Sequence, residues 1–223
     1  DGHPDAATAG NAMEGGDVVW YENRYPHWIE HTIESGSNCY YSLYIKDVDG
    51  DNIKDIVATM SKENRVVWFK NEGRGLAWTK YIIDDSLIGA GGIGSLDLYG
   101  KGATDIVATT GGPYFPGSRV VCYENRNLSW NKVEVDTDLD GASWPYASDM
   151  DGNGSMDLIV TAYRQQSVVW YENNHPEWIR HFIDDRLYGP RFLVGMDMDG
   201  DRHTDVVVTA DSSLVWYKNP FVK

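Results

Sequence analysis

Short apolar runs alternate with acidic, glycine-containing turns along nearly the whole chain. Runs such as IVAT and VVWY are apolar at consecutive positions and rich in β-branched and aromatic residues, which favour strands. No segment sustains the 3.6-residue period of an amphipathic helix. Because consecutive apolar positions place side chains on both faces of a strand, we expect both faces to be buried. The pattern therefore predicts an all-β fold with almost no helix.

The apolar runs belong to an internal repeat. Its landmark is an aspartate that closes each acidic turn, and these aspartates lie 50, 50, 52 and 48 residues apart: Asp5, Asp55, Asp105, Asp157 and Asp205. Each is followed by an apolar run such as IVATM, by a second such as VVWFKN, and by a third that opens with Trp. A fourth run precedes the next acidic turn. Four short strands in about fifty residues are typical of a β-propeller blade.

We expect one propeller domain over residues 1–223, with repeats at about 1–46, 47–96, 97–148, 149–196 and 197–223. The sequence starts inside an acidic turn, at Asp1, and stops after LVWYKN without the Trp-led run. Five four-stranded blades with an incomplete first and last blade are therefore predicted. Either these blades close into one ring, or the chain is part of a longer propeller or filament whose neighbours supply the missing strands.

Three acidic turns share the pattern D-x-D-G-[DN]-x-x-x-D, starting at Asp47, Asp149 and Asp197. Carboxylates this close repel one another unless a cation lies between them, and calcium binds six to eight oxygens in flexible geometry. Glycine at the fourth position permits the sharp turn. The predicted ligands are Asp47, Asp49, Asp51, the carbonyl of Ile53, and Asp55; Asp149, Asp151, Asn153, the carbonyl of Ser155, and Asp157; and Asp197, Asp199, Asp201, the carbonyl of His203, and Asp205.

These turns differ from EF-hands, which close with a glutamate at the twelfth position and are flanked by helices. Here the closing carboxylate is ninth and leads into a strand. The alternative is a solvated acidic turn that holds no metal. In the turn that starts at Asp97, Lys101 replaces the fifth-position acid. We expect its ammonium to bridge Asp97 and Asp105 in place of calcium.

The acidic turn, the IVAT and VVWYEN runs and the W-x-x-H-x-I run together resemble the FG-GAP/VCBS-type repeat of calcium-binding β-propellers. The resemblance covers nearly the whole chain and implies about three Ca²⁺ sites at the residues named above. Members of that family are mostly secreted or cell-surface proteins, including integrin-type heads, lectins and propeller domains attached to enzymes. The resemblance thus implies an extracellular location, where calcium is abundant enough to fill weak sites.

Composition narrows the possible partners. The formal net charge is −15 and no basic run is present, which argues against nucleic acid and anionic membranes as partners. No apolar stretch approaches the length of a membrane helix, so membrane insertion is not expected. No signal peptide is visible, and the chain is interpreted as a mature form. Cys39 and Cys122 are expected to be free thiols, with a disulfide between them as the alternative.

Catalytic motifs such as G-x-S-x-G and H-E-x-x-H are absent from the sequence, so no catalytic residues are predicted. The pairs Asp84–Asp85 and Asp184–Asp185 resemble a two-carboxylate glycosidase site, but they recur at the same turn and favour a loop role. The recurring tryptophans at 20, 68, 170 and 216 favour packing between sheets, because Cys122 occupies the same position in another repeat.

Three segments depart from the repeat: 111–118, 140–146 and 186–191. They contain a candidate sugar-stacking surface: Tyr114, Phe115, Trp144, Tyr146, Tyr188 and Arg191. The alternative is that these segments are connecting loops without a ligand.

The leading hypothesis is a secreted, calcium-stabilised propeller that binds or scaffolds a glycan or a protein and performs no chemistry. One alternative is a structural subunit that self-assembles through its terminal strands. Another is the propeller portion of a polysaccharide lyase or sugar dehydratase.

Overall fold

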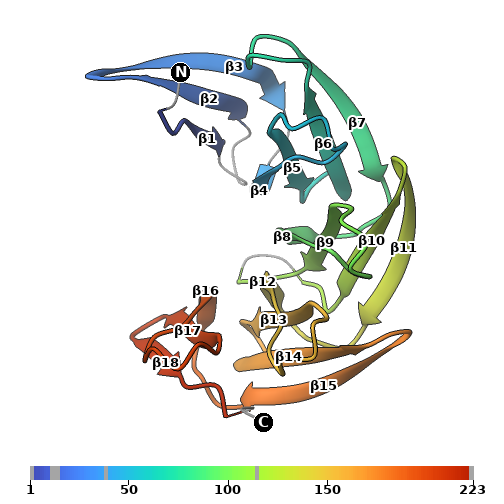
Figure 1. Cartoon of the computed structure of the whole chain (residues 1–223), viewed down its shortest axis with the longest axis vertical. Helices are drawn as coiled ribbons and strands as arrows, with labels where there is room; N and C mark the ends of the chain where they lie inside the picture. The colour runs from blue at the N-terminus through green and yellow to red at the C-terminus, as the bar shows by residue number, and fades with distance from the viewer. Residues whose placement is uncertain (1–2, 11–15, 38–39, 114–115, 221–223) are drawn as a thin grey trace. The chain divides into compact units, whose positions relative to one another are not determined.

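The computed structural model of the chain describes residues 3–10, 16–37, 40–113 and 116–220. Across these residues it contains eighteen strands and no helix. The strands form five small antiparallel sheets, each made of consecutive strands lying side by side (Figure 1). The predicted all-β class is confirmed. No helix among the described residues is long and apolar enough to cross a bilayer.

The chain divides into two compact units, Asp1–Ala90 and Gly91–Lys223. The first unit holds a three-stranded sheet, β1 to β3, and a four-stranded sheet, β4 to β7. Their bounds are β1 (Ala6–Ala9), β2 (Gly16–Arg24), β3 (His27–Ser37), β4 (Tyr40–Lys46), β5 (Asp55–Met60), β6 (Arg65–Asn71) and β7 (Trp78–Asp84).

The second unit, which begins within β8, holds two four-stranded sheets, β8 to β11 and β12 to β15, and a three-stranded sheet, β16 to β18. The bounds are β8 (Ala90–Leu96), β9 (Asp105–Thr110), β10 (Val120–Arg126), β11 (Ser129–Asp136), β12 (Ala142–Ser148), β13 (Asp157–Ala162), β14 (Ser167–Asn174), β15 (Glu177–Asp184), β16 (Pro190–Met196), β17 (Asp205–Ala210) and β18 (Leu214–Tyr217).

The second strand of each four-stranded sheet is buried on both faces, as predicted. Every residue of β5, β9 and β13 is buried. In the second unit, Val107 of β9 and Cys122 of β10 share an apolar cluster with Leu158 of β13. The recurring tryptophans at 68 and 170 are also buried, which supports their packing role, whereas Trp216 on β18 is 47% exposed. Cys122 is a buried free thiol, and Cys39 lies outside the described residues.

Buried threonines link successive sheets in the second unit. The Thr109 hydroxyl accepts a hydrogen bond from Gly92 N within its own sheet (3.0 Å) and donates to the carbonyl of Ser143 in the next sheet (2.6 Å). Thr161 makes the equivalent contacts: its hydroxyl accepts a hydrogen bond from Trp144 N of β12 and donates one to Arg191 O of β16. A Cβ at Gly92 would lie 1.8 Å from Ser143 O. Glycine is therefore required where β8 and β12 approach each other.

Replacing Thr109 by valine removes the hydroxyl while preserving the shape of the side chain. Two backbone groups, Gly92 N and Ser143 O, lose their buried partner. We expect the free energy of unfolding in urea to fall by about 1–3 kcal/mol. Thr32→Val, at an exposed position on β3, serves as the control. Equal stability of the two variants would contradict the linking role of Thr109.

Candidate metal centres

Each acidic loop is folded around the carboxylate of its first aspartate. In the loop between β4 and β5, Asp47 accepts hydrogen bonds from Gly50 N and Asn52 N, both at 2.8 Å. Asp149 and Asp197 accept the equivalent pairs in their own loops. Gly50 has a φ of +80°, as the sequence predicted for this turn. Backbone N–H groups thus hold the first carboxylate in place.

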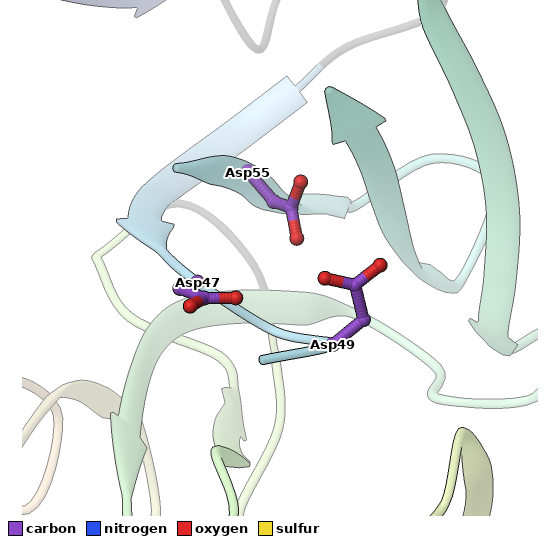
Figure 2. Close-up of side chains that lie close together, drawn as sticks. All are labelled: Asp47, Asp49 and Asp55. Carbon is purple, nitrogen blue, oxygen red and sulfur yellow. The ribbon is translucent and has the colours of Figure 1, made fainter. Parts of the chain in front are cut away.

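Three carboxylates converge in each of these loops. Figure 2 shows Asp47 and Asp49 on the loop and Asp55 at the start of β5, with their side chains directed toward a common space. One oxygen from each lies within 4.8 Å of the other two. The same holds for two further triads: Asp149, Asp151 and Asp157; and Asp197, Asp199 and Asp205. Oxygens bound at about 2.3–2.6 Å from one calcium ion have this separation, so the triads fit such an ion.

The fifth-position ligands do not all join these triads. Asp51 and Asp201 lie outside the groups of three, and each faces a lysine: Lys70 on β6 and Lys218 directly after β18. The Lys70 ammonium, 2.9 Å from Asp51, holds the pKa of that carboxyl below its usual value. Asn153 accepts a hydrogen bond from Ser155 N and donates one to Asp151. Coordination by the carbonyls of Ile53, Ser155 and His203 stays a prediction.

The closing aspartate has a structural role that the sequence reasoning missed. The Asp55 carboxylate accepts two backbone hydrogen bonds. One comes from Val48 N in the loop (3.2 Å) and the other from Asn71 N at the end of β6 (2.8 Å). We call this pair of contacts the aspartate clasp. It recurs in three further repeats, where the hydrogen bonds join Asp105 to Leu98 and Asn125; Asp157 to Met150 and Asn173; and Asp205 to Met198 and Asn219.

The asparagine of each clasp also ties the loop to its surroundings. Asn71 Nδ2 donates to the carbonyl of Lys54, directly before the closing aspartate. In the second unit, Asn173 Nδ2 donates to Leu98 O and Asn219 Nδ2 to Met150 O, each in the loop of the preceding repeat. The recurring asparagine at the end of VVWYEN was the available signal. The clasp therefore connects loops, strands and successive sheets.

Burial raises the pKa of the closing carboxyls Asp55, Asp105 and Asp157, because the protein interior disfavours their charged form. The two backbone N–H groups of each clasp act in the opposite direction. Asp105 has the same environment in a loop without an acidic triad. The clasp is thus independent of the proposed metal.

The loop that starts at Asp97 differs from the expectation. The Lys101 ammonium does not bridge Asp97 and Asp105. It lies 3.7 Å from the Glu124 carboxylate and 4.5 Å from the centre of the Tyr99 ring. The bridging prediction was wrong because Asp105 turns inward to its clasp and Asp97 is satisfied by the backbone N–H groups of residues 101 and 102.

Three of the candidate sugar-stacking residues make internal contacts. Trp144 on β12 packs edge-on against Phe192 of β16, with ring centres 4.9 Å apart. The Tyr146 hydroxyl donates to Gly195 O, and Arg191 pairs with Asp211 at 2.7 Å. The fourth, Tyr188, is 64% exposed. Tyr114 and Phe115 lie outside the described residues, and a ligand-binding role for the whole set stays a prediction.

A cavity that sequence reasoning missed lies within the first unit, between the sheets β1–β3 and β4–β7. It has a volume of about 630 Å³, and its lining includes Trp20, Glu22, Arg74 and Trp78. Both indole N–H groups donate to one carbonyl, Gly75 O, at 2.9 Å. The recurring tryptophans were the available signal, but their shared partner lies in a turn outside the repeat pattern. The size is typical of a small-molecule site.

In comparisons with known proteins, no family model matched the chain and no curated protein matched its sequence.

Replacing Asp105 by alanine separates the clasp from metal binding. The change leaves Leu98 N and Asn125 N without their partner. We expect the free energy of unfolding to fall by about 1–3 kcal/mol, equally with calcium and with a chelator. Urea unfolding under both conditions measures this. Asp138→Ala, at an exposed turn position, is the control. A loss of stability seen only with calcium would contradict a metal-independent clasp.

Proposed function

We propose that this protein is a secreted, calcium-stabilised β-propeller of the FG-GAP/VCBS type that binds or scaffolds a glycan or protein ligand. The observation that carries the proposal is the threefold repetition of one acidic triad at matching positions, with its oxygens at separations that suit one calcium ion. Three carboxylates at such distances repel one another in the absence of a cation. Their recurrence supports a bound metal more strongly than a single acidic turn does.

Calcium would act here as a structural ligand. Each triad joins two residues of a loop to the first residue of a buried strand, such as Asp55 of β5. An ion held by all three fixes the loop against that strand. Because the unfolded chain does not assemble the triad, binding stabilises the native state by RT ln(1 + [L]/Kd). Extracellular calcium is abundant enough to fill such sites, which supports the proposed location.

A propeller arrangement is supported by how neighbouring sheets pack within each unit. In the second unit, β12 contacts both β9 and β16, and buried threonines connect the sheets. In the first unit, β1 contacts β4. We extend this blade-to-blade packing to a five-bladed propeller whose first and last blades have three strands.

The cavity of the first unit supports the binding role. Tryptophan rings present apolar faces, and Glu22 and Arg74 add charged groups of both signs. Such a combination suits a sugar, whose rings have apolar faces and hydroxyl rims. The proposed ligand site is therefore this cavity, with the Trp144 and Tyr188 region as a separate candidate.

Calcium is expected to raise the melting temperature. At a hundredfold excess over Kd, each filled site contributes about 2.7 kcal/mol. For a chain of this size, one such site corresponds to a rise of about 5–10 °C. Differential scanning calorimetry in calcium and in EGTA measures the shift.

The control for calcium removes one triad carboxylate per loop through Asp49→Asn, Asp151→Asn and Asp199→Asn together. This variant should melt at the same temperature in calcium and EGTA. A wild-type melting temperature unchanged by EGTA would remove the basis of the proposal.

Ligand binding is tested by changing the exposed Arg74 at the cavity. Arg74→Asn preserves the left-handed backbone conformation (φ +58°), which asparagine tolerates. We expect a glycan array in calcium buffer to show binding by the wild type and at least tenfold weaker binding by this variant. Arg164→Asn, an exposed change in the other unit, should bind as the wild type does. Equal binding by both variants would exclude the cavity, and no wild-type binding would oppose the glycan form of the proposal.

A further inference from the structure

The residue before each clasp asparagine varies in charge between repeats, and in three of the four it faces the fifth position of the acidic loop. It is Lys70 on β6 and Lys218 after β18, in the two repeats whose loops have an aspartate at the fifth position. It is Glu124 in the repeat whose loop has Lys101 there. In these three repeats a positive strand residue accompanies a negative loop residue, or the reverse. This pairing of opposite charges indicates that the two positions interact electrostatically.

Both lysines are inserted among loop carboxylates. Lys70 Nζ donates to Asp49 and, at 2.9 Å, to Asp51. Lys218 Nζ donates to Asp199 and lies 3.1 Å from Asp201. Asp49 and Asp199 are also members of the converging triads. Each ammonium thus pairs with a carboxylate that calcium would use.

The loop that starts at Asp149 has no such lysine. The equivalent strand residue is Glu172, which is directed to His181 Nε2 at 2.9 Å and accepts a hydrogen bond from Asn174. The fifth position is Asn153, whose amide hydrogen-bonds to Asp151. Within the described part of the chain, no lysine or arginine side chain pairs with the triad of this loop.

We propose that Lys70 and Lys218 are tethered counter-cations that hold their loops closed without calcium and lower the calcium affinity of the same loops. The inference rests on the calcium-binding function proposed above and adds a specificity to it. Calcium entering the Asp47 or Asp197 loop must displace an ammonium, whereas calcium entering the Asp149 loop displaces none. The three loops then differ in their dependence on calcium.

The charges around each loop explain why displacement matters. The Asp47 loop has four carboxylates, Lys54 and the strand residue Lys70, a net charge of −2, whereas the Asp149 loop has three carboxylates and the strand residue Glu172, a net charge of −4. Long-range attraction for calcium therefore also favours the Asp149 loop. In the Asp47 loop an ion pair must in addition be broken, and its ammonium repels the arriving ion.

The test measures calcium affinity by competition with a chromophoric chelator, starting from calcium-loaded protein. Lys70→Met and Lys218→Met should each tighten one site by about tenfold, because a nearby positive charge is removed. Lys101→Met removes the same charge from a loop without a triad and should leave all affinities unchanged. Glu172→Lys, which installs the lysine beside the Asp149 loop, should weaken one site by a similar factor.

A second measurement concerns the calcium-free protein. In EGTA, Lys70→Met and Lys218→Met should melt below the wild type, because four loop carboxylates then lack their counter-cation, whereas Lys101→Met should not. If the wild type binds no calcium, the function proposed above is wrong. If the wild type binds calcium but the lysine variants match Lys101→Met in both measurements, the counter-cation inference is overturned and the calcium function remains.

Discussion

The aspartate clasp is the constraint on which the repeat depends. A closing carboxylate is buried at the start of β5, β9, β13 and β17, and it can occupy this place because two backbone N–H groups donate to it. One donor comes from the loop, and the other lies at or just beyond the end of the following strand, as Asn71 does at the end of β6. The clasp therefore fixes the loop and the strands as one unit. Its asparagine extends the contact to the preceding loop in the second unit.

The proposed metal sites are built on this clasp. Once the closing carboxylate is fixed, its loop brings two further carboxylates to it, and their mutual repulsion requires a positive charge. Two kinds of positive charge offset this repulsion. One is the ammonium of Lys70 or Lys218, and the other is the calcium ion that we propose. Where Lys101 enters the loop itself, the third-position acid is absent and Tyr99 contacts its ammonium. Electrostatic balance thus explains why the loops differ while the clasp does not.

Much of the fold was predictable because it depends on local pattern. The β-branched runs and the fifty-residue repeat predicted the strands, and consecutive apolar residues predicted the complete burial of β5, β9 and β13. The recurrent glycine predicted the left-handed turn at Gly50. These features follow from the properties of neighbouring residues, with little contribution from distant contacts.

The contacts that sequence reasoning missed join residues distant in the chain. Trp144 stood out because it departs from the repeat, but the pattern gave no sign of its contact with Phe192, forty-eight residues away. Lys101 was expected to bridge two aspartates, but Glu124 on a neighbouring strand attracts it. The direction of a side chain depends on which strand lies opposite, and the sequence pattern does not contain that information.

The most direct test of the account is the number of calcium ions bound per chain. Equilibrium dialysis against labelled calcium, at physiological salt and with excess magnesium to suppress non-specific binding, counts them. The account predicts about three ions per chain at saturation, one for each converging triad. Saturation below one ion per chain would contradict it.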